Sequence, residues 1–528
     1  MEAVALIPKP LHLEMADSSF SLNEDSCVSG EGSAEDAARL LRGYLSPATG
    51  YTLAASNRGS TIRLSLDSDL HRLGSEGYRL TVDRAGVELI APADAGLRCG
   101  AQTLRQLMDP DIYRRSPGRR SAWEIPGVVV EDSPRFAWRG AHLDVSRHFM
   151  PIHFLFRFVD LLALHKLNVF HLHLTDDQGW RLPSTRYPRL AEAGATRAES
   201  MVGPKSASAF DGTPHGGSYR REDLVELVSY AAERNVTIVP EVDLPGHMQA
   251  AIAAYPELGN TGEQLAVLTG WGVSDHVLNV SDAVLEFCRN VLAEVLEIFP
   301  STYIHVGGDE CPKGEWRASP VAQQRIAALG LADEEALQNW FTGELNDFLE
   351  REGRSLVGWD EILEGGPLPK GATVMSWRGT AGGVVAANAG FDVVMCPEVP
   401  CYFDHYQSDD EREPLAIGGR NTLEDVYSYE PVPNELDRAA AAHVIGSQFQ
   451  LWTEYMPDPG QVEYMAYPRG AAHAEVTWSG KDRDYADFSA RLVRHLERLE
   501  VFDVNYRPLD GPRPWQVGGT GARRRPQA

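Results

Sequence analysis

The sequence has few cysteines and few positive charges for its 528 residues. Its six cysteines form no CxxC pair and no zinc-ligand spacing, which argues against a disulfide framework or a zinc finger. We expect free, mostly buried thiols, with a bond between Cys396 and Cys401 as the minor alternative. The 49 basic residues are outnumbered by 75 acidic ones, which gives a net charge of -26. This charge argues against nucleic acid or an anionic membrane as the main partner and favours a neutral or cationic ligand.

Long hydrophobic runs are also missing. The most apolar stretch, residues 154–164, is interrupted by Arg157 and Asp160 and is too short to cross a bilayer. The N-terminus has no basic segment followed by a long apolar one, so no secretory signal is indicated. We therefore expect a cytoplasmic protein without a membrane partner, or a secreted one if the sequence has been trimmed.

What is present is ample material for a core, since 43% of the residues are hydrophobic and 9% aromatic. Residues 1–132 predict a small α+β domain. Within it we expect strands at 78–82 and 86–90 and helices at 34–44 and 99–108. The last segment, residues 511–528, is rich in Gly, Pro and Arg and predicts a disordered tail.

Residues 133–510 alternate between short apolar runs and helical patterns. Amphipathic helices are expected from Ile152 to Leu164 and from Asp333, as N-cap, to Glu352. Eight strand-and-helix units in this length predict a (β/α)8 TIM barrel, which would be the catalytic domain. The expected strands are 138–145, 168–175, 236–242, 302–306, 355–359, 372–377, 391–396 and 443–451.

Polar and aromatic residues follow each of the eight expected strands. In such a barrel the carboxyl ends of the strands form the functional face. Three tryptophans, a tyrosine, an arginine and many carboxylates in one place are typical of a sugar pocket, because aromatic faces pack on pyranose C–H groups while charged groups bind hydroxyls. These strand ends are residues 144–148, 171–177, 241–247, 309–310, 358–361, 376–378, 402–404 and 451–454.

We expect the chemistry to centre on Asp309 and Glu310, which follow two glycines at the end of the fourth strand. The glycines would let a substrate approach closely, although adjacent acids can also be a solvated loop pair or a helix N-terminus. Two-carboxylate glycosidases hold their acids roughly 5–5.5 or 6.5–9.5 Å apart across the scissile bond, which neighbouring residues can hardly do. An alternative known among glycosidases is that the substrate's own 2-acetamido group is the nucleophile.

Several motifs together resemble those of family 20 glycoside hydrolases, the β-N-acetylhexosaminidases. The resemblance runs from about residue 80 to 480, and Gly100–Leu104 is similar to the small α+β domain that precedes the family's barrel. It implies a retaining, exo-acting glycoside hydrolase that removes terminal β-linked GlcNAc or GalNAc from an oligosaccharide or glycoconjugate through an oxazolinium intermediate. It implies no cofactor and no metal, and a monomer or homodimer. The motifs are Asp144–His148, Leu174–Trp180, Pro245–His247, His305–Glu310, Gly358–Glu361 and Trp452–Glu454.

Residue roles follow from the matching positions. The resemblance implies that Glu310 is the general acid and then the base, that Asp309 binds the acetamido N–H, and that Tyr402 donates to the acetamido oxygen. It further implies that Trp359, Trp377 and Trp452 wall the sugar, that Arg147, Asp404 and Glu454 bind its hydroxyls, and that Asp176 and His247 orient Glu310 from behind. We also predict that ionised Asp309 and the Trp-lined cleft raise the pKa of Glu310, giving a bell-shaped or acid-side pH optimum.

Two rival functions and one open feature accompany this interpretation. His171 and His173, with Asp176, Asp177, His247 and His305, also resemble the layout of a metal-dependent hydrolase. A sugar-binding protein without catalysis is the second rival. Residues 198–217 predict a long loop near the rim that could narrow or extend the site.

Overall fold

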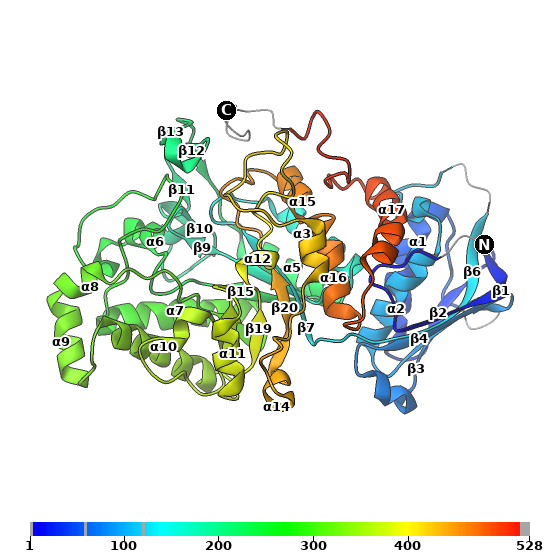
Figure 1. Ribbon diagram of the computed structural model, residues 1–528, viewed down its shortest axis with the longest axis horizontal. Coiled ribbons are helices and arrows are strands. Elements are labelled where there is room, and N and C mark those ends of the chain that lie inside the picture. The colour runs from blue at the N-terminus through cyan, green and yellow to red at the C-terminus, as the bar shows by residue number, and fades with distance from the viewer. Residues whose placement is uncertain (1–3, 57–60, 119–121, 518–528) are drawn as a thin grey trace.

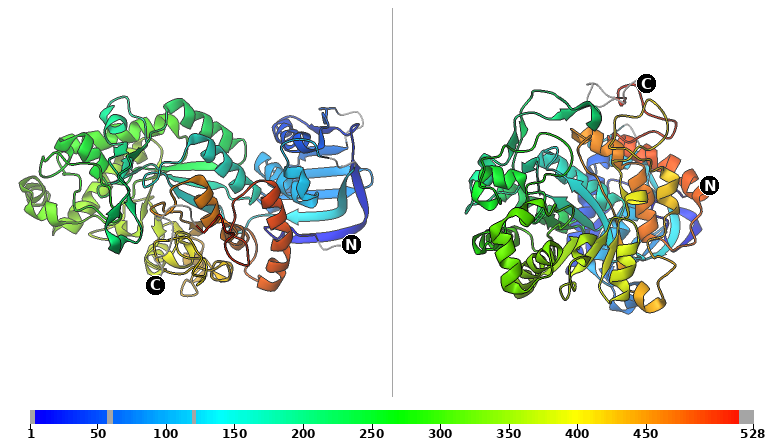
Figure 2. Two further views of the ribbon diagram at one scale, coloured as in Figure 1. Left: turned by 90° about the horizontal axis from the view of Figure 1, so that it is seen from above. Right: turned by 60° about the vertical axis from the view of Figure 1, so that its left-hand side comes forward.

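The computed structural model describes residues 4–56, 61–118 and 122–517, which form two parts lying side by side (Figure 1). A sheet with helices is followed along the chain by a barrel surrounded by helices (Figure 2). The predicted combination of an α+β unit and a TIM barrel is therefore confirmed. Residues 518–528 of the predicted disordered tail lie outside the described residues.

The N-terminal sheet has six strands in the order β1-β6-β4-β5-β3-β2. Along β4 and β5 alternate residues are buried, so one face of the sheet carries apolar side chains, and helices α1 and α2 cover it. Both predicted strands and both predicted helices are present, the helices being longer than expected. The bounds are β1 His12–Leu22, β2 Val28–Gly30, α1 Ala34–Thr49, β3 Ile62–Leu66, η1 Ser68–Leu73, β4 Tyr78–Asp83, β5 Gly86–Ala91, α2 Asp94–Leu107, η2 Pro110–Tyr113 and β6 Trp123–Asp132.

The barrel is closed by eight parallel strands in the order β15-β16-β17-β18-β19-β20-β7-β8. Its strands are covered on both faces, so every residue of β7 and β8 is buried, the polar side chains included. Each of the eight predicted strands overlaps one of them. The bounds are β7 Trp138–Asp144, β8 Val169–His173, β15 Thr237–Glu241, β16 Tyr303–His305, β17 Ser355–Trp359, β18 Thr373–Ser376, β19 Val393–Met395 and β20 Val444–Phe449.

Helices surround the barrel, and both helices predicted by name are present. Helix α3 spans Ile152–Leu164, and α10 spans Glu334–Arg351 with the Asp333 carboxylate accepting from Ala336 N at its start. The chain between β17 and β18 is described throughout and forms only the short helix η5, Asp360–Leu363. The other helices are α5 Arg221–Ala232, α6 Gln249–Ala254, η4 Pro256–Leu258, α7 Asp282–Ile298, α8 Gly314–Ala318, α9 Pro320–Leu329, α11 Ala381–Asn388, α12 Glu398–Cys401, α13 Leu423–Ser428, α14 Arg438–Ala441, α15 Pro459–Ala466, α16 Arg469–Trp478 and α17 Tyr485–Val501.

The loop predicted at residues 198–217 folds into small antiparallel pairs at the edge of the barrel (Figure 1). Strand β11 pairs with β14, and β12 pairs with β13. Nearer the barrel, β9 and β10 form a tight pair directly after β8. The bounds are β9 Thr175–Asp176, β10 Gly179–Trp180, α4 Arg189–Glu192, β11 Thr196–Arg197, β12 Met201–Val202, η3 Lys205–Ala207, β13 Ala209–Phe210 and β14 His215–Gly216.

A buried polar cluster joins the two parts. Lys166, after α3, donates to Asp132 of β6 at 3.0 Å and to the Tyr78 hydroxyl of β4 at 2.8 Å. Trp478 of α16 donates to the same carboxylate at 3.0 Å. The Lys166 and Asp132 side chains are 1% and 0% exposed, so each charge depends on its partner for stabilisation.

All six cysteines are free, and five of them are buried, so the main expectation is confirmed and a bond between Cys396 and Cys401 is absent. Among the described helices we find none with the length and apolar character that a membrane crossing requires.

Candidate active site

The carboxyl ends of the barrel strands surround a pocket of about 280 Å³. Most of the side chains predicted from the sequence meet there: Arg147, Asp309, Glu310, Trp377, Tyr402, Asp404, Trp452 and Glu454. Three other predicted residues lie behind this lining and are described below. Five further lining residues were not expected from the sequence, because they follow β19 without a strand pattern of their own: Glu398, His405, Ile417, Gly418 and Gly419.

The acid pair is delivered by a tight turn after β16. Gly307 has φ 66°, and a Cβ there would lie 1.7 Å from Asp243 Oδ1, so only glycine fits. The same Asp243 oxygen accepts from Gly308 N at 3.1 Å. Glu310 follows with φ 45°, a left-handed conformation that costs a non-glycine residue free energy and is often found at functional sites.

Both carboxyl groups of the pair face one imidazole. His247 Nε2 lies 3.5 Å from Glu310 Oε2 and 3.7 Å from Asp309 Oδ2. The Asp309 side chain is 11% exposed, whereas that of Glu310 is 43% exposed and reaches the opening. The two carboxyl groups are therefore on the same side of the pocket.

Aromatic rings form the wall beside the acid pair. The Tyr402 ring stacks near Trp377, with centroids 6.1 Å apart and planes at 23°. The Tyr402 and Trp452 ring centroids are 6.5 Å apart. Trp359 is predicted to line the sugar, but it is 1% exposed, lies against Trp452 and donates from Nε1 to Glu241 at 3.0 Å. It supports the wall from behind.

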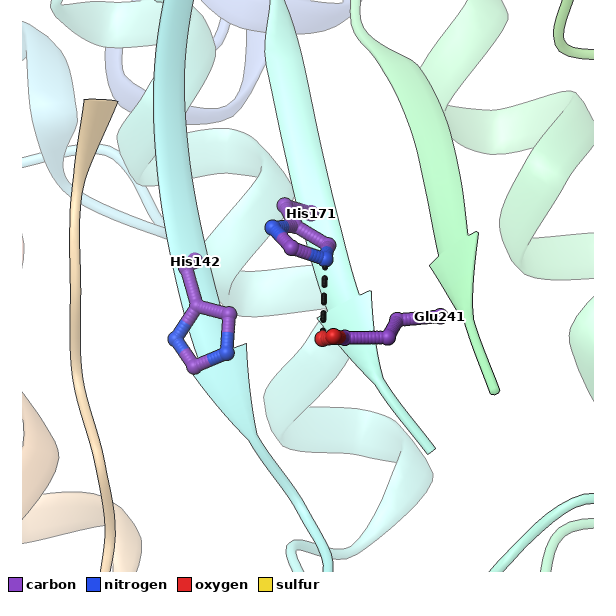
Figure 3. A group of neighbouring side chains, drawn as sticks. All are labelled: His142, His171 and Glu241. Atoms are coloured by element: carbon purple, nitrogen blue, oxygen red, sulfur yellow. Dashed lines mark ion pairs between the residues drawn. The ribbon is translucent and has the colours of Figure 1, made fainter. Parts of the chain in front are cut away.

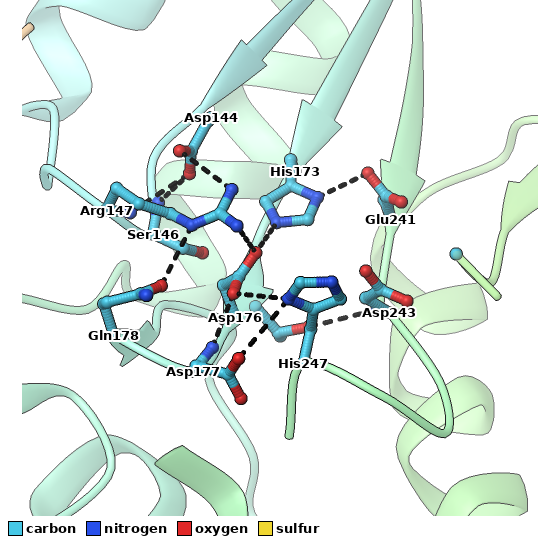
Figure 4. Close-up of polar contacts among 12 residues, drawn as sticks. Asp144, Ser146, Arg147, His173, Asp176, Asp177, Gln178, Glu241, Asp243 and His247 are labelled. Atoms are coloured by element: carbon cyan, nitrogen blue, oxygen red, sulfur yellow. Dashed lines mark hydrogen bonds and ion pairs between the residues drawn. The ribbon is translucent and has the colours of Figure 1, made fainter. Parts of the chain in front are cut away.

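Arg147 is held firmly at another side of the pocket. Its guanidinium lies 2.9 Å from Asp176 and donates to Gln178 at 2.9 Å (Figure 4). Close by, Asp404 Oδ1 and Glu454 Oε2 are buried and have no hydrogen-bond partner within the described chain. Burial and the neighbouring Glu454 raise the pKa of Asp404 well above its usual range. This region thus offers one cationic donor and two unpaired oxygens to a polar ligand.

The prediction of a raised pKa for Glu310 is wrong. The His247 imidazole beside it lowers the pKa of Glu310, and this outweighs the opposing effect of burial. It is Asp309 whose pKa is raised, because of burial. For His247, burial favours a lower pKa, but Asp176 and Asp243 reverse this and raise the pKa well above its usual range. The resemblance placed His247 behind Glu310, but the pKa prediction counted only Asp309 and the Trp-lined cleft and left out the positive charge of this imidazole.

Among the described residues, three groups of side chains have the ligand types of a metal site. In the group His142, His171 and Glu241, His171 Nε2 lies 3.0 Å from Glu241 (Figure 3). Trp138 N–H donates to Gln448 Oε1, so the Gln448 amide nitrogen is the donor to His171 Nδ1. The His171 proton is then on Nε2, 3.0 Å from Glu241, so no lone pair remains there for a metal. Neither nitrogen of His142 has a hydrogen-bond partner in the described chain.

The other two groups share His247. In the first, the Asp176 and Asp177 oxygens already accept from Arg147, His173 and backbone N–H groups. In the second, burial raises the pKa of both Asp243 and Asp309, so a proton rather than a cation would neutralise that pair. The donor sets of these two groups therefore fit hydrogen bonds and protons better than the predicted rival, a catalytic metal.

Family models match almost the whole chain. The catalytic domain of glycosyl hydrolase family 20 matches residues 136–481, and domain 2 of the same family matches residues 3–133. A β-hexosaminidase of Porphyromonas gingivalis is 40% identical over 98% of this chain, and the match spans 66% of that protein's own length. A β-hexosaminidase of Akkermansia muciniphila is 34% identical, with 86% of this chain and 90% of that protein covered.

Solved structures agree with this assignment. An exo β-N-acetylglucosaminidase of Vibrio harveyi, in complex with N-acetylglucosamine, superposes with a TM-score of 0.84 at 32% identity, covering 97% of this chain and 79% of that one. A β-N-acetylhexosaminidase of Streptomyces coelicolor gives 0.83 at 32% identity, covering 97% and 99%. The sequence motifs, the barrel and the pocket thus agree with the family models, and the chain belongs to glycosyl hydrolase family 20 and is a glycoside hydrolase.

Proposed function

We propose that this chain is an exo-acting, retaining β-N-acetylhexosaminidase that removes terminal non-reducing GlcNAc or GalNAc by substrate-assisted catalysis. The observation that carries the proposal is the position of the acid pair. Asp309 and Glu310 both lie within 3.7 Å of the same His247 nitrogen, on one side of the pocket. Two-carboxylate glycosidases place their acids on opposite sides of the scissile bond, so the nucleophile here would come from the substrate.

The side chains supply what that reaction needs. The 2-acetamido oxygen attacks the anomeric carbon, the glycosidic bond breaks, and the leaving oxygen takes the proton of Glu310. Asp309 accepts the acetamido N–H and offsets the positive charge of the oxazolinium. Glu310 then removes a proton from water as that water attacks the anomeric carbon, and the ring opens. Two inversions at one carbon leave the product in its original β configuration.

The remaining pocket residues favour a terminal sugar. Arg147 can donate to hydroxyls, and the unpaired oxygens of Asp404 and Glu454 can accept from them. Trp377, Tyr402 and Trp452 offer flat faces for the pyranose ring and the acetamido methyl group. A relative that the structure resembles was solved with N-acetylglucosamine bound, which supports the same class of ligand.

The test is hydrolysis of p-nitrophenyl β-N-acetylglucosaminide and the matching galactosaminide in the presence of EDTA. We expect the wild type to turn over at least one of them, and Glu310→Gln to lose about 10²–10⁴-fold in kcat, because it can no longer donate the proton. Glu364→Gln is the matched control: its side chain is 47% exposed, against 43% for Glu310, and it pairs with Arg378 rather than lining the pocket. Its activity should stay within about twofold of the wild type.

Two further measurements separate this mechanism from its rivals. The first product seen by NMR should be the β-anomer, and a substrate with an N-trifluoroacetyl group should react more slowly, since fluorine weakens the attacking oxygen. Activity that EDTA removes and zinc restores would instead indicate a metal-dependent hydrolase. Sugar binding without turnover would indicate a binding protein.

A further inference from the structure

Beneath the pocket, inside the barrel, histidines gather around a single carboxylate. Glu241 ends β15, and its oxygens lie 2.5–3.0 Å from nitrogens of His171, His173, His305 and Trp359. Glu241 and the three histidines are all 0% exposed. Residues 171 and 173 are alternate positions on β8 and therefore point to the same inner face. Neither the catalytic steps above nor the sugar contacts use this cluster.

One of these histidines, His173, also contacts Asp176, which lies outside the cluster. His173 Nδ1 lies 2.5 Å from Glu241, and His173 Nε2 lies 2.7 Å from Asp176 (Figure 4). A carboxylate only accepts, so a ring that donates to two carboxylates carries protons on both nitrogens. Burial alone favours a lower pKa for His173, but Glu241 and Asp176 outweigh it and raise the pKa well above its usual range. His173 is therefore an imidazolium cation.

Asp176 carries the connection on to the acid pair. It lies 3.1 Å from His247 Nδ1 and 2.9 Å from Arg147. The other nitrogen of His247 faces Glu310 and Asp309. Glu241, His173, Asp176, His247 and Glu310 thus form one line of alternating charge from the barrel interior to the opening.

We infer that Glu241 and His173 are positioning residues for the catalytic acid, acting through Asp176 and His247. This rests on the proposed function. His173 fixes the rotation of Asp176 by taking one of its oxygens, and this leaves the other oxygen aimed at His247. Together with Arg147 and His247, the His173 hydrogen bond also keeps Asp176 ionised at 1% exposure, and ionised Asp176 in turn keeps His247 protonated opposite Glu310.

Other charged groups also face this line of residues. Asp177 and Asp243 act on His247, and Asp144 and Glu454 act on Arg147. His171 and His305 share Glu241 with His173, but neither contacts Asp176 in the described structure. His171 is therefore the matched control, because it is on the same strand, is equally buried and faces the same carboxylate.

The variants separate geometry from charge. His173→Gln is neutral, but its amide nitrogen reaches the position of Nε2 and can still donate to Asp176. His173→Asn is neutral and reaches only the position of Nδ1, so its contact with Asp176 is lost. We expect kcat on the aryl glycoside to fall about 100-fold in His173→Asn and about tenfold in His173→Gln, with KM within about threefold for both, since Asp144 and Gln178 still hold Arg147.

The pH profile of kcat/KM measures the effect of the positive charge on His173. Removal of a buried cation raises the pKa of nearby carboxyl groups, so both limbs of kcat/KM should move to higher pH by about half a unit or more in both His173 variants. His171→Asn should leave the limbs at the wild-type pH, whatever it does to stability. Equal losses in the two His173 variants with unmoved limbs, or an equal shift in His171→Asn, would overturn the inference.

A second readout does not need turnover. In protein labelled with ¹⁵N-histidine, the ring signals of His247 should titrate at a different pH in His173→Asn and His173→Gln than in the wild type, and at an unchanged pH in His171→Asn. If the wild type hydrolyses no aryl glycoside, the proposed function is wrong. The titration of His247 would still show whether His173 affects His247 through Asp176. If His247 titrates at the wild-type pH in both His173 variants, the inference about His173 is wrong, even if the enzyme is active.

Discussion

Asp309 and Glu310 are adjacent residues whose pKa values are shifted in opposite directions. Burial raises that of Asp309, while the His247 imidazole lowers that of Glu310. The proposed reaction needs the reverse arrangement, with the proton on Glu310 and the charge on Asp309. The working form, with Glu310 protonated and Asp309 ionised, is therefore the less populated of the two singly protonated forms. A bound acetamido N–H would favour it by stabilising ionised Asp309.

This predicts the shape of the pH profile. Below the first macroscopic pKa both groups are protonated and Asp309 cannot accept; above the second, both are ionised and Glu310 cannot donate. The second proton leaves mostly from Asp309, so the alkaline limb of kcat/KM should lie above the ordinary carboxyl range. In Asp309→Asn the limb reports Glu310 alone, and we expect it to move to lower pH in the residual activity, measured by stopped assays from about pH 3 to 9.

Glu361 is one of the groups that could produce a similar alkaline limb. Burial and the nearby Asp309 raise the pKa of Glu361 to about 8, and it accepts from Trp377 of the pocket wall at 3.0 Å. Glu361→Gln is therefore the control. Suppose the alkaline limb of kcat/KM disappears in Glu361→Gln but stays at the same pH in Asp309→Asn. Ionisation of Glu361, and not of the acid pair, would then determine the limb.

At the scale of the element, the turn after β16 decides where the acid pair points. We predict that Gly307→Ala destabilises the protein by about 2–5 kcal/mol, because a Cβ would lie 1.7 Å from Asp243 Oδ1 in a backbone conformation already unfavourable for alanine. The activity that remains should fall by about 100-fold or more, since the carboxyl groups would be displaced. Urea unfolding and kcat measure the two effects.

Gly330 provides the comparison for this turn. It ends α9 with the same φ of 66°, and a Cβ added there would meet no other described atom within 4 Å. Gly330→Ala should therefore cost only about 1 kcal/mol and leave kcat within about twofold. Equal losses in the two variants would show that backbone conformation alone, and not the contact with Asp243, makes Gly307 necessary.

The elements also show what a sequence can and cannot predict. Each barrel strand is a short apolar run that ends in polar residues, so the strands, the barrel and most of the pocket lining followed from local pattern. The contacts among Glu241, His173 and His305 did not, because inward-facing residues of three strands meet only when the barrel closes. The predicted pKa of Glu310 was wrong for a different reason: it counted Asp309 and burial but not the positive charge of His247, which the resemblance had placed behind Glu310.

The long loop at residues 198–217 is a further case. Its glycines and prolines predicted irregular structure near the rim, but the pattern could not show that it folds into short strand pairs. All of its residues are described, and none of them lines the pocket. Its effect on substrate length therefore has to come from ligand portions that extend beyond the pocket.

At the scale of the whole molecule, stability depends on the contact between the sheet and the barrel. Lys166→Met would leave Asp132 buried at 0% exposure with hydrogen bonds but no opposite charge. We expect this to cost about 3–5 kcal/mol, measured by urea unfolding followed by tryptophan fluorescence. The double variant Lys166→Met/Asp132→Asn should recover part of the loss, because no unpaired charge then remains.

An exposed ion pair between the same two parts serves as the control. Lys9 lies 2.9 Å from Asp487 of α17, but the two side chains are 55% and 39% exposed. Water screens such a pair, so Lys9→Ala should change the unfolding free energy by less than about 1 kcal/mol. If Lys166→Met were as mild as Lys9→Ala, the sheet would not depend on the buried pair for its attachment, and the packing of α2 against α3 would be the interaction to test next.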